Sequence, residues 1–201
     1  VSVIITVDVG TVAFDAVAHA QGKGVDVIVT DHHEVIGGVP PAAHAVINPK
    51  IVPYPFPGLC GTGVAFKLVQ ALLIEGKLRD LPAFTGIPDG WEKWLLDLVA
   101  IATVADMVPM IGENRALVYW GLRVLRKSPR IGIRALCAQV RLRQEEITED
   151  DIGFSIAPRI NAASRMDEPA LALRLLTTAD RAEAAPLALH REELNASRKG
   201  V

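Results

Sequence analysis

The sequence contains few cysteines and few aromatic residues. Of its 201 residues only two are cysteine, Cys60 and Cys137, and 5% are aromatic. Neither cysteine belongs to a Cys-x-x-Cys pair, so the sequence offers neither a disulfide framework nor a structural zinc site. We therefore expect a protein of a reducing compartment, with a cytoplasmic location.

The sequence also lacks a long uncharged apolar run and a strong net charge. Its most apolar stretch, residues 95–111, contains Asp97 and Asp106, which argues against a membrane partner. The net charge of −2 points to neither nucleic acid nor lipid. The charge is uneven, because residues 115–143 hold eight Lys or Arg and no acid. This stretch forms either solvated helix faces or a surface that faces phosphates.

An initiating methionine is absent as well. The chain starts with valine inside an apolar run and stops inside a charged helical pattern. Its composition, 50% hydrophobic and 22% charged, is that of a folded protein with a core. We expect the chain to be a fragment of a longer protein.

Strand-like and helix-like patterns alternate over the first fifty residues. Residues 1–7 and 25–30 are β-branched and apolar runs that predict two core strands, and residues 43–47 predict a third. Between the first two strands, Thr11 is placed to cap a helix whose apolar residues recur at helical spacing over residues 13–20. Such a βαβ unit has parallel strands. We therefore expect an α/β fold with a parallel sheet of βαβ units.

The rest of the chain is mostly helical in pattern. Residues 49–59 contain too much proline and glycine for a regular element, and helix breaks are expected at residues 128–129 and 153–158. We expect three parts: an α/β part over residues 1–110, a helical part over residues 111–178, and the start of a connector helix over residues 179–201.

Polar side chains follow both of the first two predicted strands. Asp8 follows the first strand, and Asp31-His32-His33 follows the second. Because the carboxyl ends of parallel strands meet at one edge, where ligands bind in open α/β sheets, these side chains predict a metal site. Consecutive residues of an extended chain point to opposite sides, so we expect one imidazole on the metal, the other on the substrate, and Asp31 behind the metal ligand. The alternative is a helix cap at Asp8 and a turn cap with two surface histidines.

A third carboxylate, Asp106, follows a long apolar helical run. An acid at the carboxyl end of a helix meets the negative end of the helix dipole, which is unfavourable. This placement favours a metal ligand over a simple helix exit.

Two further segments offer candidate phosphate ligands. Arg115 lies in a predicted turn into a helix, while Arg159, Asn161 and Arg165 surround a proline. Arginine binds phosphate in a bidentate manner, so these side chains could hold a nucleic-acid backbone. The alternative is that the two later arginines pair with nearby acids: Asp150, Asp151 and Asp167.

In this order the residues resemble the motifs of the DHH phosphoesterase superfamily. Residues 6–10 match its second motif, residues 29–34 the third, and residues 103–109 the fourth. Three further segments favour the RecJ-type single-strand-specific 5′→3′ exonucleases: residues 47–50, 59–67 and 157–165. The family's Asp-rich first motif and its C-terminal domain have no counterpart, and Ser164 stands where the family usually has glycine.

The resemblance implies a partial DHH domain and a site for two ions, Mn²⁺ or Mg²⁺. In that site Asp8 bridges the ions, and His32 and Asp106 complete one of them. His33 faces the scissile phosphate, and Asp31 orients His32.

The implied activity is metal-dependent hydrolysis of single-stranded DNA from its 5′ end in recombination and repair, carried out by the parent protein rather than by the fragment. Single-strand-binding protein or a helicase is an implied partner. Two alternatives remain: a DHH oligoribonuclease or nucleotide phosphatase, and a non-catalytic DHH-like subunit that binds single strands or replication proteins.

Overall fold

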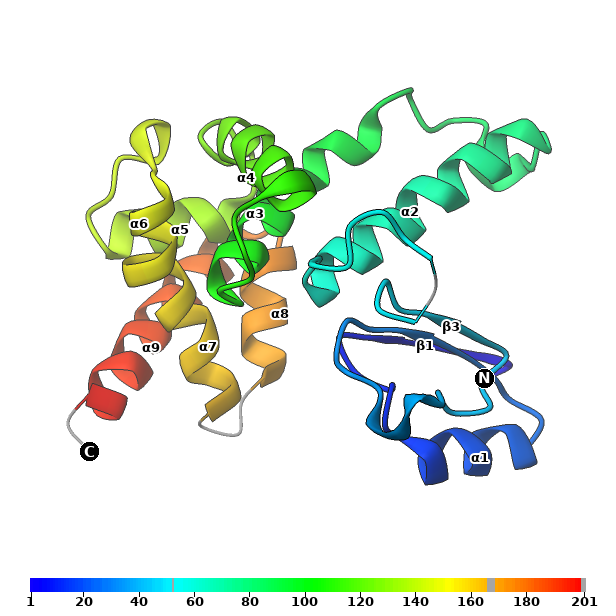
Figure 1. Ribbon diagram of the computed structural model, residues 1–201. Helices are drawn as coiled ribbons and strands as arrows, with labels where there is room; N and C mark the ends of the chain where they lie inside the picture. The colour runs from blue at the N-terminus through cyan, green and yellow to red at the C-terminus, as the bar shows by residue number, and fades with distance from the viewer. Residues whose placement is uncertain (52, 166–168, 200–201) are drawn as a thin grey trace. The chain divides into compact units, whose positions relative to one another are not determined.

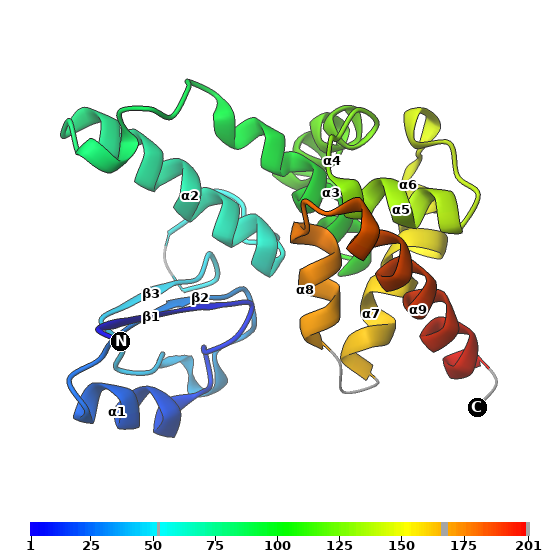
Figure 2. The same ribbon diagram turned by 180° about the vertical axis from the view of Figure 1, so that it is seen from behind.

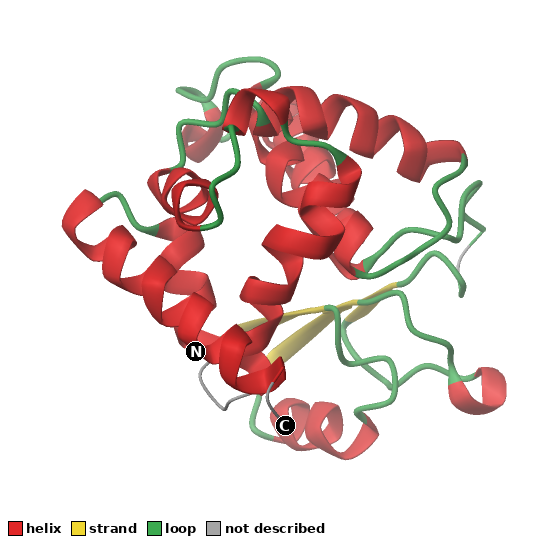
Figure 3. Ribbon diagram, turned by 90° about the vertical axis from the view of Figure 1, so that its left-hand side faces the viewer, coloured by secondary structure: helices red, strands yellow, loops and turns green. Residues whose placement is uncertain are grey.

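The computed structural model describes residues 1–51, 53–165 and 169–199. It divides into two compact units, one of residues 1–95 with 106–117, the other of residues 96–105 with 118–201. Strands occur in the first unit, whereas the described part of the second is helical (Figure 3). The α/β class and the parallel sheet are confirmed, while the expected boundaries after residues 110 and 178 stay predictions.

The first unit is built on a three-stranded parallel sheet in the order β1 (Val3–Val7), β2 (Asp26–Thr30), β3 (Ala45–Ile47). The strands are rich in β-branched residues, which pack well on a pleated surface. Val7 lies opposite Thr30, and Thr30 lies opposite Ile47. The three strands therefore end level with one another, and the residues that follow them meet at one edge.

Two helices cover the sheet. Helix α1 (Phe14–Gly22) lies on one face, and α2 (Gly61–Leu78) lies on the other (Figure 1). Val17 of α1 packs against Val27 and Val29 of β2, and these three side chains are buried. The unit also contains three 3-10 helices: η1 (Ile36–Gly38), η2 (Pro82–Phe84) and η3 (Trp91–Leu95).

Strand β1 differs from the expected core strand. Its side chains are largely exposed, with Val3 at 45% and Ile5 at 50% of full accessibility. Among the described residues β1 pairs only with β2, so it forms an edge of the sheet. The apolar run predicted the strand correctly, but the prediction that this strand is buried in the core was wrong. A run of apolar residues does not distinguish an edge strand from a central one.

The predicted role of Thr11 as a helix cap is also wrong. Helix α1 begins at Phe14, and its N-cap residue, Ala13, makes no side-chain cap. Thr11 is fully buried instead, and its N–H donates to Asp31 Oδ2 at 2.9 Å. The hydroxyl that would have capped the helix accepts a hydrogen bond from Asn48.

The second unit is a set of packed helices, several of which lie side by side in Figure 2. Its core is formed by apolar side chains that include Ile101, Leu125 and Ile152. Helix α4 begins in the first unit and continues into the second. The helical elements are α3 (Leu96–Ala105), α4 (Gly112–Leu125), α5 (Ile131–Gln139), η4 (Gln144–Glu146), α6 (Glu149–Asp151), η5 (Ile152–Ile156), α7 (Ala157–Arg165), α8 (Pro169–Thr177) and α9 (Arg181–Lys199).

The helix break expected at residues 128–129 is confirmed, but the one at residues 153–158 is wrong. The chain is helical without interruption from Glu149 to Arg165, through the π-helical turn η5. Pro158 lies where the π-helical turn η5 passes into α7. Proline and glycine are therefore accommodated by a change of helix type. Within the described residues, no helix is long and apolar enough to span a membrane.

Candidate metal centre

Asp8 occupies an unusual backbone conformation directly after β1. Its φ angle is 62°, in the left-handed region that a residue with a side chain seldom adopts. Its N–H donates to the carbonyl of Thr30 at 2.9 Å, which continues the pairing of β1 with β2. Two residues later Gly10 has φ 123°, and a Cβ there would lie 2.8 Å from Thr6 Oγ1. The chain turns sharply here and projects the Asp8 carboxylate from the strand edge, a strained geometry of the kind found at functional sites.

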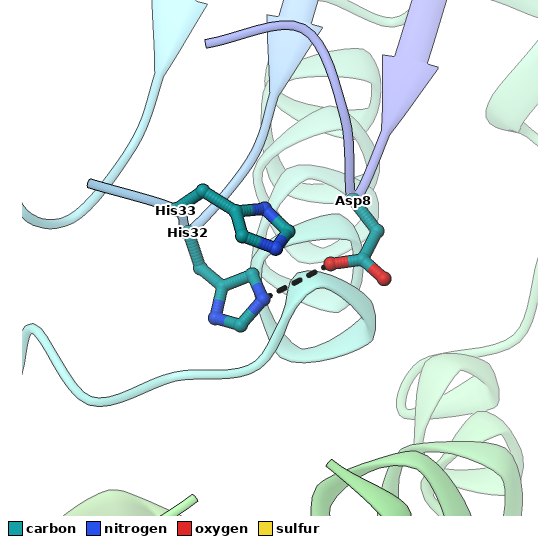
Figure 4. Close-up of side chains that lie close together, drawn as sticks. All are labelled: Asp8, His32 and His33. Atoms are coloured by element: carbon teal, nitrogen blue, oxygen red, sulfur yellow. Dashed lines mark ion pairs between the residues drawn. The ribbon is translucent and has the colours of Figure 1, made fainter. Parts of the chain in front are cut away.

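Two carboxylates face one imidazole at this edge. His32 Nε2 lies 3.0 Å from Asp8 Oδ1 and 3.6 Å from Asp106 Oδ2. Figure 4 shows the His32 ring turned toward the Asp8 carboxylate, with Asp8 following β1 and the histidines following β2. Asp106 comes from the segment after α3. Residues distant in sequence thus meet as the strand ends predicted, and their assignment as metal ligands stays a prediction.

Asp31 lies behind His33 rather than His32. Its Oδ1 is 2.7 Å from His33 Nδ1, whereas its only contact with His32 is with the main-chain N–H at 2.8 Å. The expectation that Asp31 orients the His32 ring is therefore wrong. Residues two apart on an extended chain point to the same side, which is consistent with the contact between Asp31 and His33. The assignment of Asp31 to His32 came from the family resemblance.

Hydrogen bonds fix the charge of this pair. Burial raises the pKa of the Asp31 carboxyl, but the Thr11 N–H and the His33 ring donate to it and hold the pKa well below its usual range. The same bond to Asp31 raises the pKa of His33. Asp31 is therefore a stable carboxylate that favours the protonated form of His33. Burial raises the pKa of Asp8.

Asn48 joins the ends of the strands and is a residue whose role the sequence analysis missed. Its side chain is fully buried and directly follows β3. Its Nδ2 donates to the His33 carbonyl at 2.9 Å and to Thr11 Oγ1 at 3.1 Å, while its Oδ1 accepts from the Lys50 N–H at 2.9 Å. Two signals were available: Asn48 follows a predicted strand, and it belongs to residues 47–50, one of the segments that resemble the RecJ type.

The N-terminus of α2 lies directly against Asp8. A Cβ on Gly61 would stand 2.2 Å from Asp8 Oδ1, so only glycine leaves room for the carboxylate as it lies here. The preceding residue, Cys60, caps the helix through its buried sulfur, which accepts from the Gly63 N–H at 3.4 Å. The helix start thus forms one wall of the site.

Hydrogen bonds from the start of α4 hold the segment that follows Asp106. Buried Asn114, in the first turn of α4, donates through Nδ2 to the carbonyls of Pro109 at 3.0 Å and Gly58 at 2.7 Å. Tyr54 donates to Glu113 at 2.9 Å, and Lys67 forms an ion pair with the same carboxylate. The proline-rich segment and the segment after Asp106 are therefore both tied to the start of α4.

Asp8, His32 and His33 form a donor set that fits a divalent metal ion, and Asp106, 3.6 Å from His32 Nε2, lies outside this group of three. One ligand atom from each of Asp8, His32 and His33 can be chosen so that all three lie within 4.8 Å of one another, the only such His/Cys/Asp/Glu group of three among the described residues. Carboxylate and imidazole ligands together suit Mn²⁺, whereas oxygen alone would suit Mg²⁺ better. The carboxylates would otherwise repel each other, and a cation between them removes that repulsion.

The predicted phosphate ligands lie on helices. Arg115 is exposed in the first turn of α4. Arg159 is partly buried on α7, and its Nη1 donates to the Ser155 carbonyl at 2.8 Å, while Asn161 is exposed on the same helix. The side chain of Arg165 falls outside the described residues. Phosphate binding by these residues stays a prediction.

A family model matches half of the chain. The model of the DHH family, N-terminal domain, matches residues 2–103. This range contains the three strands, Asp8 and the two adjacent histidines.

Curated relatives extend the similarity to the entire sequence. The single-stranded-DNA-specific exonuclease RecJ of Haemophilus influenzae is 41% identical over 204 aligned residues, which is 100% of this chain and 35% of that protein. The RecJ of Bacillus subtilis is 41% identical over 98% of this chain and 23% of its own length. The chain spans about a third or less of these relatives.

Solved structures agree. A crystal structure of Thermus thermophilus RecJ in complex with Mn²⁺ is similar, with TM-score 0.82 and 38% identity. The match covers 99% of this chain and 28% of the RecJ chain. A structure of exonuclease RecJ bound to manganese matches with TM-score 0.83 and 38% identity, covering 99% of this chain and 48% of its own.

Proposed function

The chain belongs to the DHH family, and on that premise we propose that it forms the metal-binding core of a single-strand-specific 5′→3′ DNA exonuclease. The observation that carries the proposal is the convergence of Asp8 and Asp106 on His32 Nε2, at 3.0 and 3.6 Å. The similarity to RecJ proteins, two of them solved with manganese, supports the choice of substrate and metal.

Asp8, His32 and Asp106 would hold Mn²⁺ or Mg²⁺, with Asp8 shared between two ions in the complete protein. When bound, such ions would supply Lewis-acid chemistry, polarising a phosphoryl oxygen and making a water molecule more acidic. The level strand ends present Asp8 and His32 at one edge of the sheet, and Asp106 reaches them from the segment after α3.

His33 would act on the phosphate. Because its Nδ1 lies 2.7 Å from Asp31 Oδ1, the ring is oriented and its Nε2 remains for the substrate. Its side chain is 59% exposed, which allows a phosphodiester to reach it. The carboxylate of Asp31 favours the imidazolium form, which donates a hydrogen bond to a phosphate oxygen and offsets charge that develops during hydrolysis.

The remaining assignments belong to the same proposal. Arg115, Arg159, Asn161 and Arg165 would contact the backbone of the strand, and single-strand-binding protein or a helicase would deliver the substrate in the cytoplasm. Such phosphate contacts make affinity fall as salt rises.

A substrate series tests the proposal. Full-length protein is incubated with Mn²⁺ and single strands of increasing length, labelled at the 3′ end, beside the matching duplex. We expect stepwise shortening of long single strands from the 5′ end and little cleavage of duplex. Activity confined to very short oligomers would indicate an oligoribonuclease or phosphatase instead. Binding of single strands without hydrolysis would indicate a non-catalytic subunit.

A further inference from the structure

Helix α4 exposes two adjacent aromatic side chains in a protein that has few. Tyr119 is 52% and Trp120 53% accessible. Burial of large aromatic side chains against a partner is favourable, because it removes apolar surface from water. Neither residue takes part in the metal centre.

Arg123 lies against both rings, and together the three residues form an aromatic–arginine cluster in the second unit. The guanidinium carbon is 4.5 Å from the centre of the Tyr119 ring and 5.0 Å from that of Trp120. The two rings meet edge to face, with centres 5.2 Å apart at 83°. Arg123 also donates a hydrogen bond to the Tyr119 hydroxyl. These contacts orient all three side chains before any ligand arrives.

Arg123 gives the cluster a positive charge. It is one of eight Lys or Arg in residues 115–143, a stretch of sequence without acid, in which Arg130 pairs with Asp97 at 2.9 Å. Arg123 contacts the Tyr119 and Trp120 rings, which do not neutralise its charge, whereas the Arg143 guanidinium pairs with Glu146 at 2.7 Å. An anionic partner is therefore complementary to Arg123.

We propose that the aromatic–arginine cluster is a binding site for the bases and backbone of single-stranded nucleic acid. Oriented aromatic rings stack on unpaired bases, and a guanidinium beside them can stack or contact a phosphate. A duplex hides the faces of its bases, so the cluster selects single strands. The site adds a second contact to the exonuclease proposed above and rests on that function only for the identity of the strand.

Binding without hydrolysis tests the site. Full-length protein is titrated in EDTA against a fluorescein-labelled single strand of deoxythymidines, and affinity is read from fluorescence anisotropy. We expect Trp120→Ala and Arg123→Ala each to raise the Kd by about 5- to 150-fold, the range of one lost base–aromatic stack. Trp120→Phe keeps a stacking face and should retain most of the affinity.

Matched controls come from the first unit. Trp91→Ala removes another exposed tryptophan, and Arg79→Ala removes an exposed arginine of α2's C-terminal end, which pairs with Glu75. Both should bind as the wild type does. Thermal unfolding of all variants checks that the fold is unchanged.

Three results would overturn the site. Trp120→Ala and Arg123→Ala could bind the strand no more weakly than the controls. Trp120→Phe could lose as much affinity as Trp120→Ala. The variants could bind the single strand as the wild type does but bind an acidic peptide more weakly, which would make the cluster a protein-docking surface. Because no metal is present in the titration, each result is separate from a failure of the proposed exonuclease, which the Mn²⁺ assay measures.

Discussion

His32 is the residue around which the candidate metal centre is arranged, since the carboxylates of Asp8 and Asp106 both face its Nε2. Asp8 follows β1 with φ 62°, His32 follows β2, and Asp106 follows α3. The site therefore depends on two strand ends and one helix end.

Removal of one carboxylate charge tests this arrangement. Asp8→Asn keeps the shape of the side chain and loses its charge, so we expect Mn²⁺ affinity to fall by more than about 100-fold, beyond the effect of losing an outer contact. Isothermal titration of full-length protein measures this. Asp15→Asn, on α1, is the matched control. Equal affinity in the two variants would remove Asp8 from the site.

The buried amide of Asn48 supports the same edge. Asn48→Ala leaves the Thr11 hydroxyl, the His33 carbonyl and the Lys50 N–H without their partner. We expect a loss of about 1–3 kcal/mol in the free energy of unfolding, measured with urea. Asn161→Ala removes an exposed amide and should change stability by less than about 0.5 kcal/mol. A similar small change in Asn48→Ala would contradict the buried network.

The sequence predicts the meeting of Asp8 with Asp31, His32 and His33, because the carboxyl ends of parallel strands share an edge. Alternation along the chain places Asp31 on the side of His33, whereas the family resemblance assigned it to His32. The sequence does not predict the contacts of Asn48, whose partners come from two other segments.

At the scale of elements, the start of α2 lies directly against the candidate metal centre. Gly61 lies against Asp8, whereas a Cβ on Gly63 would make only ordinary contacts at 3.5 Å. The two glycines on one helix therefore provide a matched pair.

We expect Gly61→Ala to displace the Asp8 carboxylate, because the new Cβ would stand 2.2 Å from Oδ1. Mn²⁺ affinity and Mn²⁺-dependent hydrolysis should fall at least tenfold. Thermal stability should fall as well, because the new Cβ would also stand 2.5 Å from Asp8 Cβ, which moves only with the backbone. Gly63→Ala should retain both metal affinity and hydrolysis. If Gly63→Ala lost as much metal affinity as Gly61→Ala, the effect would belong to the helix and not to Asp8.

A buried ionic contact fixes the connection between α4 and α5. Asp97 of α3 accepts from Ser128 Oγ at 2.7 Å and from Arg130 Nε at 2.9 Å. Asp97→Ala strands these donors, so we expect a loss of about 3–5 kcal/mol in unfolding free energy by urea. Glu146→Ala breaks an exposed pair with Arg143 and should cost less than about 1 kcal/mol. Equal losses would show that burial does not set the strength of these pairs.

Strands and their parallel order follow from apolar runs alone, whereas helix boundaries do not. Thr11 forms no cap because Asp31 and Asn48 compete for its polar groups. The chain from Glu149 to Pro158 stays helical because a π-turn absorbs the irregularity, which no periodic pattern reports.

The whole molecule combines an α/β unit that carries the metal centre with a helical unit that carries the aromatic–arginine cluster. Its net charge of −2 hides a basic stretch on the helices, so global charge was a poor guide to the surface. Membership of the DHH family and the strand-edge geometry point to the same chemistry.

The central claim is that Asp8, His32 and Asp106 hold the catalytic metal. Crystals of full-length protein grown with Mn²⁺ and measured at the manganese absorption edge test it directly. We expect an anomalous peak within bonding distance of Asp8, His32 and Asp106. A manganese peak bonded elsewhere, with these three side chains ligand-free, would contradict it.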